Sequence, residues 1–184
     1  MALAATVYHL QIDLSDVDRG VYQALDLRLA RHPSESMAYL LTRVIAYCLC
    51  FDEGIAFSKG LSTTDEPALW IRDLQGNLTT WIDVGNPSAE RLHKASKACK
   101  NVVVFTQHDP VLLQKAAREK AIHRADQIAV FALDPRFLEQ LGALTDRNTR
   151  WTLVHTEGTL YLTVGEQNLS SAVVKHPLVP DDGA

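Results

Sequence analysis

The chain has 184 residues, of which 47% are hydrophobic and 22% are charged. This length and composition suit one globular domain with a sizeable core, and they argue against a disordered chain. The formal net charge of −4 excludes a surface coated in positive charge for indiscriminate nucleic-acid binding. A negative net charge is still compatible with a local basic surface.

The N-terminal residues lack the basic leader and the continuous apolar core of a secretory signal. No apolar run reaches the ~18 residues that a membrane span requires. The three cysteines, Cys48, Cys50 and Cys99, form no CxxC pair, so neither a disulfide scaffold nor a cysteine zinc site is expected. We therefore expect a cytoplasmic protein.

The N-terminal part of the chain predicts a β-hairpin followed by a helix. Apolar and polar residues alternate over 4–14 and 21–29, as in half-buried strands, and the intervening SDVDRG has the composition of a turn. An apolar-periodic helix is predicted over 35–51. Ser34 is its expected N-cap, and Glu35 in the first turn suits the helix dipole.

The middle of the chain predicts an α-β-β-β-α-β order that begins with this helix. Short strands are expected at 55–61, 68–72 and 78–84, the last two paired through a tight turn. A helix over 88–100 follows, and the continuous apolar run 102–106 is typical of a buried strand. We therefore predict an α/β (α+β) fold with a mixed β-sheet.

The C-terminal part continues with alternating elements and ends in a second hairpin. The patterns predict a helix starting at Asp109-Pro110, a strand at 127–133, a short helix from Asp134 to near Gly142, hairpin strands at 150–155 and 159–164, and a strand at 169–174. The residues after 174 are expected to form a mobile tail.

Three acids can converge on this scaffold. Asp65 precedes the strand 68–72, and Asp83 lies near the end of the strand paired with it, so a hairpin brings the two carboxylates to one edge. Glu35 can approach the same edge from the first helix. Converging carboxylates bind a hard divalent ion such as Mg²⁺, which activates water and stabilises charge on a phosphoryl oxygen. The alternative is that all three acids are ordinary surface, cap or turn residues.

The helix 88–100 carries cations beside these acids. Arg91 and Lys94 are candidates for neutralising a phosphate or a leaving group, with a solvated basic face as the alternative. Lys97 and Lys100 are better explained by the solvated face, because they complement the helix C-terminus. The seven histidines show no metal-binding spacing, and Trp70 and Trp81 are expected as cross-strand neighbours rather than a base-stacking platform.

Five phrases in chain order resemble the bacterial YaeQ family: LARHPSE (29–35), DEP-x-LW (65–70), WIDVG-x-P (81–87), R-x-x-KA (91–95) and DR-x-T (146–149). The resemblance covers essentially the whole chain. It implies a single domain over 1–184, with a core at about 34–107 and hairpin extensions at 4–30 and 149–175.

The family is described as a variant of the PD-(D/E)xK nuclease fold, and the resemblance therefore implies a Mg²⁺-dependent phosphodiesterase site. Glu35 takes the role of the helix glutamate, and Asp65 and Asp83 those of the metal-binding acids. Gly85 stands where that superfamily has a lysine, so the cation would have to come from the next helix, with Lys94 as the candidate and Arg91 beside it.

Two hypotheses follow from these residues and this resemblance. The first is a metal-dependent phosphodiesterase acting on nucleic acid, in which Asp65 and Asp83 hold Mg²⁺, Glu35 assists, and Lys94 or Arg91 stabilises the transition state. The second is a nuclease-like module that has lost catalysis and binds nucleic acid or a protein partner. Gly85 favours the second hypothesis unless Lys94 replaces the missing lysine.

Overall fold

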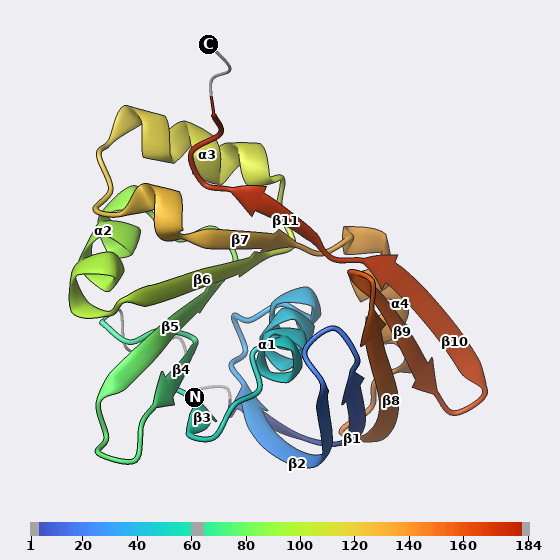
Figure 1. Ribbon diagram of the computed structural model, residues 1–184. Helices are drawn as coiled ribbons and strands as arrows, with labels where there is room; N and C mark the ends of the chain where they lie inside the picture. Colours follow the sequence, from blue (N-terminus) through green and yellow to red (C-terminus); the bar gives the residue numbers. More distant parts are fainter. Residues whose placement is uncertain (1–3, 60–64, 182–184) are drawn as a thin grey trace.

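A computed structural model describes residues 4–59 and 65–181. The described chain forms two mixed β-sheets with the helix α1 (Met37–Leu49) between them (Figure 1). The predicted α+β class is confirmed. Within the described residues, no helix combines the length and apolar character that a membrane crossing requires.

The first sheet, here called sheet A, joins the two ends of the chain. Its strand order is β10-β9-β8-β1-β2. Its strands are β1 (Thr6–Asp16), β2 (Val21–Arg31), β8 (Asn148–Thr156), β9 (Thr159–Val164) and β10 (Gln167–Ala172). Both predicted hairpins are present, and β1 pairs in parallel with β8, so the hairpins build one sheet.

The second sheet, here called sheet B, carries the middle of the chain. Its strand order is β11-β7-β6-β5-β4-β3. Its strands are β3 (Ile55–Phe57), β4 (Leu69–Arg72), β5 (Leu78–Val84), β6 (Asn101–Thr106), β7 (Ala129–Ala132) and β11 (Val174–Pro177). β4 and β5 pair antiparallel, as predicted, and β5, β6 and β7 are parallel. Trp70 and Trp81 are cross-strand partners in this sheet, which confirms their expected pairing.

The remaining helical segments lie on the far side of sheet B, except for one helix that packs with α1 on sheet A. These are α2 (Ala89–Ala98), α3 (Pro110–Glu119), the 3₁₀ turn η1 (Ala125–Gln127) and α4 (Pro135–Leu144). Figure 1 shows α2 and α3 together on the outer side of sheet B, and α4 beside sheet A. α3 and α4 both begin at a proline that follows an aspartate N-cap, as the sequence predicts.

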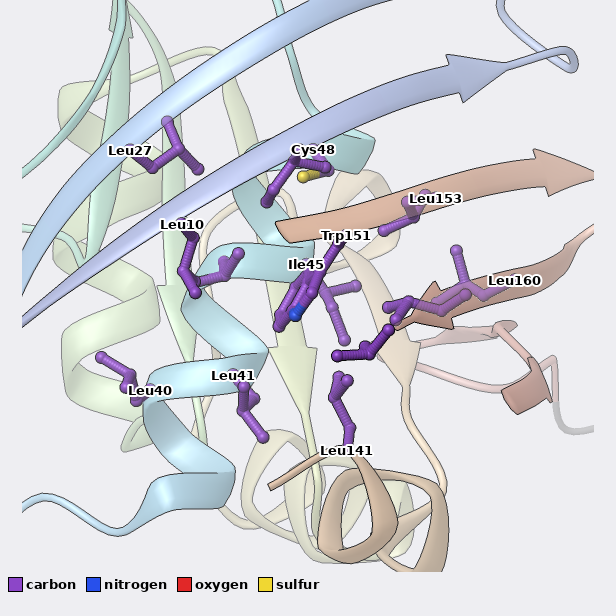
Figure 2. Close-up of a cluster of buried hydrophobic side chains, with 14 of the residues drawn as sticks. Leu10, Leu27, Leu40, Leu41, Ile45, Cys48, Leu141, Trp151, Leu153 and Leu160 are labelled. Atoms are coloured by element: carbon purple, nitrogen blue, oxygen red, sulfur yellow. The ribbon is translucent and has the colours of Figure 1, made fainter. Parts of the chain in front are cut away.

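The largest buried cluster lies where α1 meets the inner face of sheet A. Figure 2 shows Leu40, Leu41 and Ile45 of α1 facing Leu10 and Trp151 of the sheet. Trp151 is completely buried. Its truncation to alanine would cost about 3–5 kcal/mol, the usual range for a large aromatic side chain in a core.

The expected start of α1 is wrong by two residues. Ser36, not Ser34, is the N-cap, and its Oγ accepts a hydrogen bond from the Tyr39 amide at 3.1 Å. Glu35 therefore precedes the helix instead of occupying its first turn. The physical reason is a turn before the helix, in which the Glu35 amide donates to the His32 carbonyl at 2.9 Å.

The expected mobile tail is also wrong for the residues directly after 174. Val174–Pro177 form β11, which pairs with β7 at the edge of sheet B, and Leu178 is 1% exposed. The sequence signal is weak because proline and lysine interrupt the apolar pattern. Residues 182–184 of the expected tail, and residues 60 and 61 of the strand predicted at 55–61, lie outside the described residues.

Candidate functional site

Asp83 lies near the carboxyl end of β5, a central strand of sheet B. The next strand, β6, is parallel to β5, so the loops that follow both strands meet at the same edge. Ligands in α/β sheets bind at such edges. Asp83 is 2% exposed, and a charged side chain at this depth needs a partner.

Arg91 supplies that partner from the first turns of α2. Ser88 caps the helix by accepting a hydrogen bond from the Arg91 amide at 3.2 Å. The guanidinium then contacts both carboxylate oxygens of Asp83, with Nε–Oδ2 and Nη2–Oδ1 distances of 2.8 Å. It also donates to the Glu66 carbonyl and lies over the Trp81 ring. The hydrogen bonds that Arg91 donates to Asp83 raise the pKa of Arg91.

A pocket of about 420 Å³ opens at this ion pair. Its walls come from α1, the loop before β4, the loop after β5 and the loop after β6. The lining residues are Tyr39, Arg43, Ser58, Glu66, Pro67, Ala68, Asp83, Val84, Gly85, Asn86, Pro87, Arg91, Gln107 and His108. The Oε1 atom of Gln107 is buried without a hydrogen-bond partner in the described chain, which is unusual for a buried amide.

Glu35 forms a second buried ion pair behind one wall of the pocket. Its Oε1 lies 2.9 Å from Nη2 of Arg43, and both side chains are at most 4% exposed. The Glu35 Oε2 accepts the His32 amide at 3.2 Å. Burial raises the pKa of Glu35 despite the adjacent Arg43, because desolvation outweighs the attraction.

Asp65 and Lys94 lie at a neighbouring opening. Both are exposed and line a smaller pocket of about 330 Å³ together with Trp81, Ser88, Glu90 and Arg91. Arg91 lines both pockets, whereas Asp83 lines only the first and Asp65 only the second. The carboxylates of Asp65 and Asp83 both act electrostatically on Arg91. We predict that the carboxylates of Asp65 and Asp83 lie within ~6 Å of each other, a distance that one metal ion can bridge.

Gly85 stands at the position for which the family resemblance predicts a missing lysine. Its φ is +92°, in the region that favours glycine, and a Cβ there would lie 3.4 Å from the Tyr39 ring. The backbone at this position therefore disfavours any side chain. Lys94, the predicted replacement, lines the smaller pocket.

Two of the three predicted acids are engaged by arginines in this arrangement. Both oxygens of Asp83 are bound by Arg91, and Glu35 is paired with Arg43. Over residues 4–59 and 65–181, no group of three or more His, Cys, Asp or Glu side chains is placed to hold a metal ion. The positive charge beside Asp83 is supplied by a guanidinium.

Sequence reasoning missed the residues that complete the pocket. Arg43 is the clearest omission, since a lone arginine in the apolar run YLLTRVIAYCL indicates a buried charge that needs a partner. Tyr39, Glu66, Gln107 and His108 carry no comparable signal. Gln107 and His108 reach the pocket through the parallel pairing of β5 and β6, whereas Tyr39 comes from α1 and Glu66 from the loop before β4.

A second feature is the charge of the outer helical layer, defined here as residues 89–100 and 109–127. It holds eight of the 18 lysines and arginines of the chain but only four of its 22 acids. The cations are Arg91, Lys94, Lys97, Lys100, Lys115, Arg118, Lys120 and Arg124. All except Arg91 are exposed. An acidic chain therefore carries one basic surface, and Arg91 connects it to the Asp83 pocket.

The fold and this site define an α+β protein in which a partly buried arginine pairs with a buried aspartate at the edge of a mixed sheet. A family model for the YaeQ protein matches residues 1–173. The chain belongs to the YaeQ family.

Relatives and solved structures agree with this assignment. The chain is 30% identical to an uncharacterised YaeQ protein of Escherichia coli K12 over 171 residues, which cover 92% of this chain and 94% of the relative. A YaeQ crystal structure from Xanthomonas axonopodis pv. citri matches with a TM-score of 0.86 and 33% identity, covering 96% of this chain and 100% of that one. A YaeQ crystal structure from Pseudomonas syringae matches with a TM-score of 0.84 and 30% identity, covering 97% and 98%.

Proposed function

We propose that this protein is a nuclease-like module that binds the sugar-phosphate backbone of a nucleic acid through its outer helical layer. The observation that carries the proposal is the concentration of cations on that layer, which has a net charge of +4 in a chain of net charge −4. Clustered lysine and arginine side chains bind phosphates by releasing condensed counterions, with little regard to base sequence.

The Asp83 pocket would determine where the nucleic acid lies on this basic surface. Lys94 and Arg91 lie one helical turn apart on α2, and both line the smaller pocket. A strand crossing α2 would therefore pass Lys94 and reach the wall of the Asp83 pocket. Asp65 and Glu90 face the same opening, so contact there is expected to involve individual phosphates instead of a uniformly positive groove.

A second candidate function is metal-dependent phosphodiester hydrolysis. The supporting observation is that the charges of Asp65 and Asp83 both interact with Arg91. These are the two acids that the family resemblance predicts as metal ligands. An ion could use the Asp83 carboxylate fully only if Arg91 released it. The bidentate Asp83–Arg91 pair thus favours binding over catalysis.

Binding is tested by fluorescence anisotropy with labelled single-stranded DNA, duplex DNA and structured RNA at low salt. Lys94→Glu/Lys97→Glu should weaken binding by about tenfold or more, since each reversal replaces an attraction with a repulsion. Arg28→Glu/Arg150→Glu is the matched control, because it changes the net charge equally at exposed residues of sheet A. Equal losses in both double variants, or no binding by wild type, would contradict the proposal.

The same preparations decide the second candidate. Each nucleic acid is incubated with wild type, Asp83→Asn and Asp65→Asn in Mg²⁺ or Mn²⁺. Cleavage by wild type that is lost in both variants would establish hydrolysis. Binding without cleavage would leave the binding module as the function.

A further inference from the structure

The structure holds a second cavity, of about 700 Å³, on the inner side of sheet B. Its volume is in the range of small-molecule sites. It shares no lining residue with the Asp83 pocket or with the opening at Lys94. The proposed nucleic-acid binding does not use it.

The floor of the cavity belongs to sheet B and adjoins the C-terminal end of α1. It consists of apolar side chains from neighbouring strands, among them Ile71, Val103 and Phe131. Phe131 stacks on Phe105 with ring centroids 5.1 Å apart and an angle of 20° between the planes. Val103 and Phe131 remain partly exposed, whereas Phe105 is 1% exposed. An apolar, partly aromatic sheet surface of this kind favours a planar apolar ligand.

Most charges around the cavity are already engaged within the protein. Arg19 donates to the Leu49 and Phe51 carbonyls at 2.8 and 2.7 Å, which fixes it at the end of α1. Asp18 accepts the Glu157 and Gly158 amides at 2.7 and 2.9 Å. His155 contacts Asp16 at 2.9 Å. Asp52, also at the end of α1, is an exposed acid that would repel an anion on that side.

Lys175 differs from these residues. It is exposed on β11, and its side chain has no hydrogen bond or ion pair with the part of the chain that the structure describes. Its cross-strand partner is Phe131. Directly paired residues of antiparallel strands place their side chains on the same face of the sheet. The cavity therefore sets an uncompensated ammonium group beside a partly exposed aromatic ring.

We propose that this cavity binds a small planar aromatic anion, with its ring on the apolar floor and its anionic group at Lys175. The ring gains the burial of apolar surface against Val103 and Phe131. The carboxylate or a similar group gains a charge-assisted contact with the ammonium of Lys175. A ligand of this shape with a positive charge is disfavoured by the same lysine.

The test uses 2-naphthoate as the probe and 2-naphthylmethylammonium as its cationic counterpart, with binding followed by ¹H–¹⁵N NMR titration. Naphthoate should bind saturably and shift the amides of Val103, Phe131 and Lys175, and the cation should bind more weakly. Lys175→Glu should weaken naphthoate binding by about fivefold or more, since an exposed ion pair is replaced by a repulsion. Lys97→Glu, which changes the net charge equally on the opposite side of sheet B, should leave naphthoate binding unchanged.

Thr80→Trp provides a test independent of charge, because Thr80 lines the cavity and a bulky side chain would fill it. With a well-dispersed spectrum retained, this variant should lose naphthoate binding. The proposal is overturned if naphthoate does not saturate, if its shifts lie elsewhere, if the cation binds equally well, or if Lys175→Glu binds naphthoate like wild type.

Discussion

Arg91 holds both carboxylate oxygens of Asp83 at 2.8 Å, at the place where the family resemblance predicts a metal ion. The arginine comes from α2 and the aspartate from β5, and the short loop between these elements brings them together. A fixed guanidinium provides the positive charge that a buried aspartate requires. This pair is the basis for assigning a binding function in preference to catalysis.

The energetic importance of this pair can be measured by a double-mutant cycle. Asp83→Ala should lower the free energy of unfolding by about 3 kcal/mol, because it leaves a half-buried guanidinium without its counter-charge. The double variant Asp83→Ala/Arg91→Ala should lose less than the sum of the single losses, with a coupling energy of about 1–3 kcal/mol. Urea unfolding checks both values, with exposed Lys97→Ala as a control that should change stability by about 0.5 kcal/mol at most. Additive losses would mean that the pair contributes no coupling.

Glu35 should make stability depend on pH in an unusual direction. Its pKa in the folded state is raised above its ordinary value of 4.5 by burial. The folded protein therefore binds this proton more tightly than the unfolded chain does, and the carboxyl lowers stability as pH rises from 4.5 through the raised value. Glu35→Gln removes this contribution. The unfolding free energy of wild type minus that of Glu35→Gln should therefore fall with rising pH. A difference that grows with pH would mean that attraction to Arg43 outweighs desolvation.

The three thiols should be unreactive in the folded protein. Burial raises the pKa of Cys50 to about 12 and the pKa of Cys48 further still, and Cys99 is 4% exposed. The thiolate is the reactive species, so labelling of partly buried Cys50 by Ellman's reagent at pH 8 should be slow, and labelling of buried Cys48 and Cys99 should be limited by unfolding. All three thiols should react at once in denaturant. Rapid labelling of one thiol in native buffer would contradict this burial, and Cys50→Ser would show whether Cys50 is responsible.

Local patterns predicted the elements of this fold better than their assembly. The α-β-β-β-α-β order and the β4–β5 pairing depend on short-range alternation and turns, which the sequence displays directly. The parallel pairing of β1 with β8 joins residues about 140 positions apart, for example His9 with Asn148, and no local pattern reports it. β11 is absent from the prediction because its own apolar pattern is weak, and its pairing with β7 is likewise not visible in a local pattern.

In the candidate site, too, the sequence indicates individual residues but not how they pair. Asp83 and Arg91 were both identified as candidates, because an acid at a strand end and a cation early in the next helix can be read from spacing. Their mutual pairing was not foreseen, since spacing does not tell whether a carboxylate faces a metal ion or a neighbouring guanidinium. Arg43, the partner of Glu35, lies eight residues away in the apolar run of α1, where the sequence indicates a buried charge but does not indicate which acid pairs with it.

The most direct test of the proposed function is the salt dependence of nucleic-acid binding. The slope of log K against log salt concentration counts the phosphates that the protein neutralises, at about 0.9 for each phosphate on duplex DNA. If the outer helical layer is the binding surface, Lys94→Ala/Lys97→Ala should reduce the magnitude of this slope by about 2, and Arg28→Ala/Arg150→Ala should leave it at the wild-type value. A slope unchanged by Lys94→Ala/Lys97→Ala would show that nucleic acid binds elsewhere or not at all.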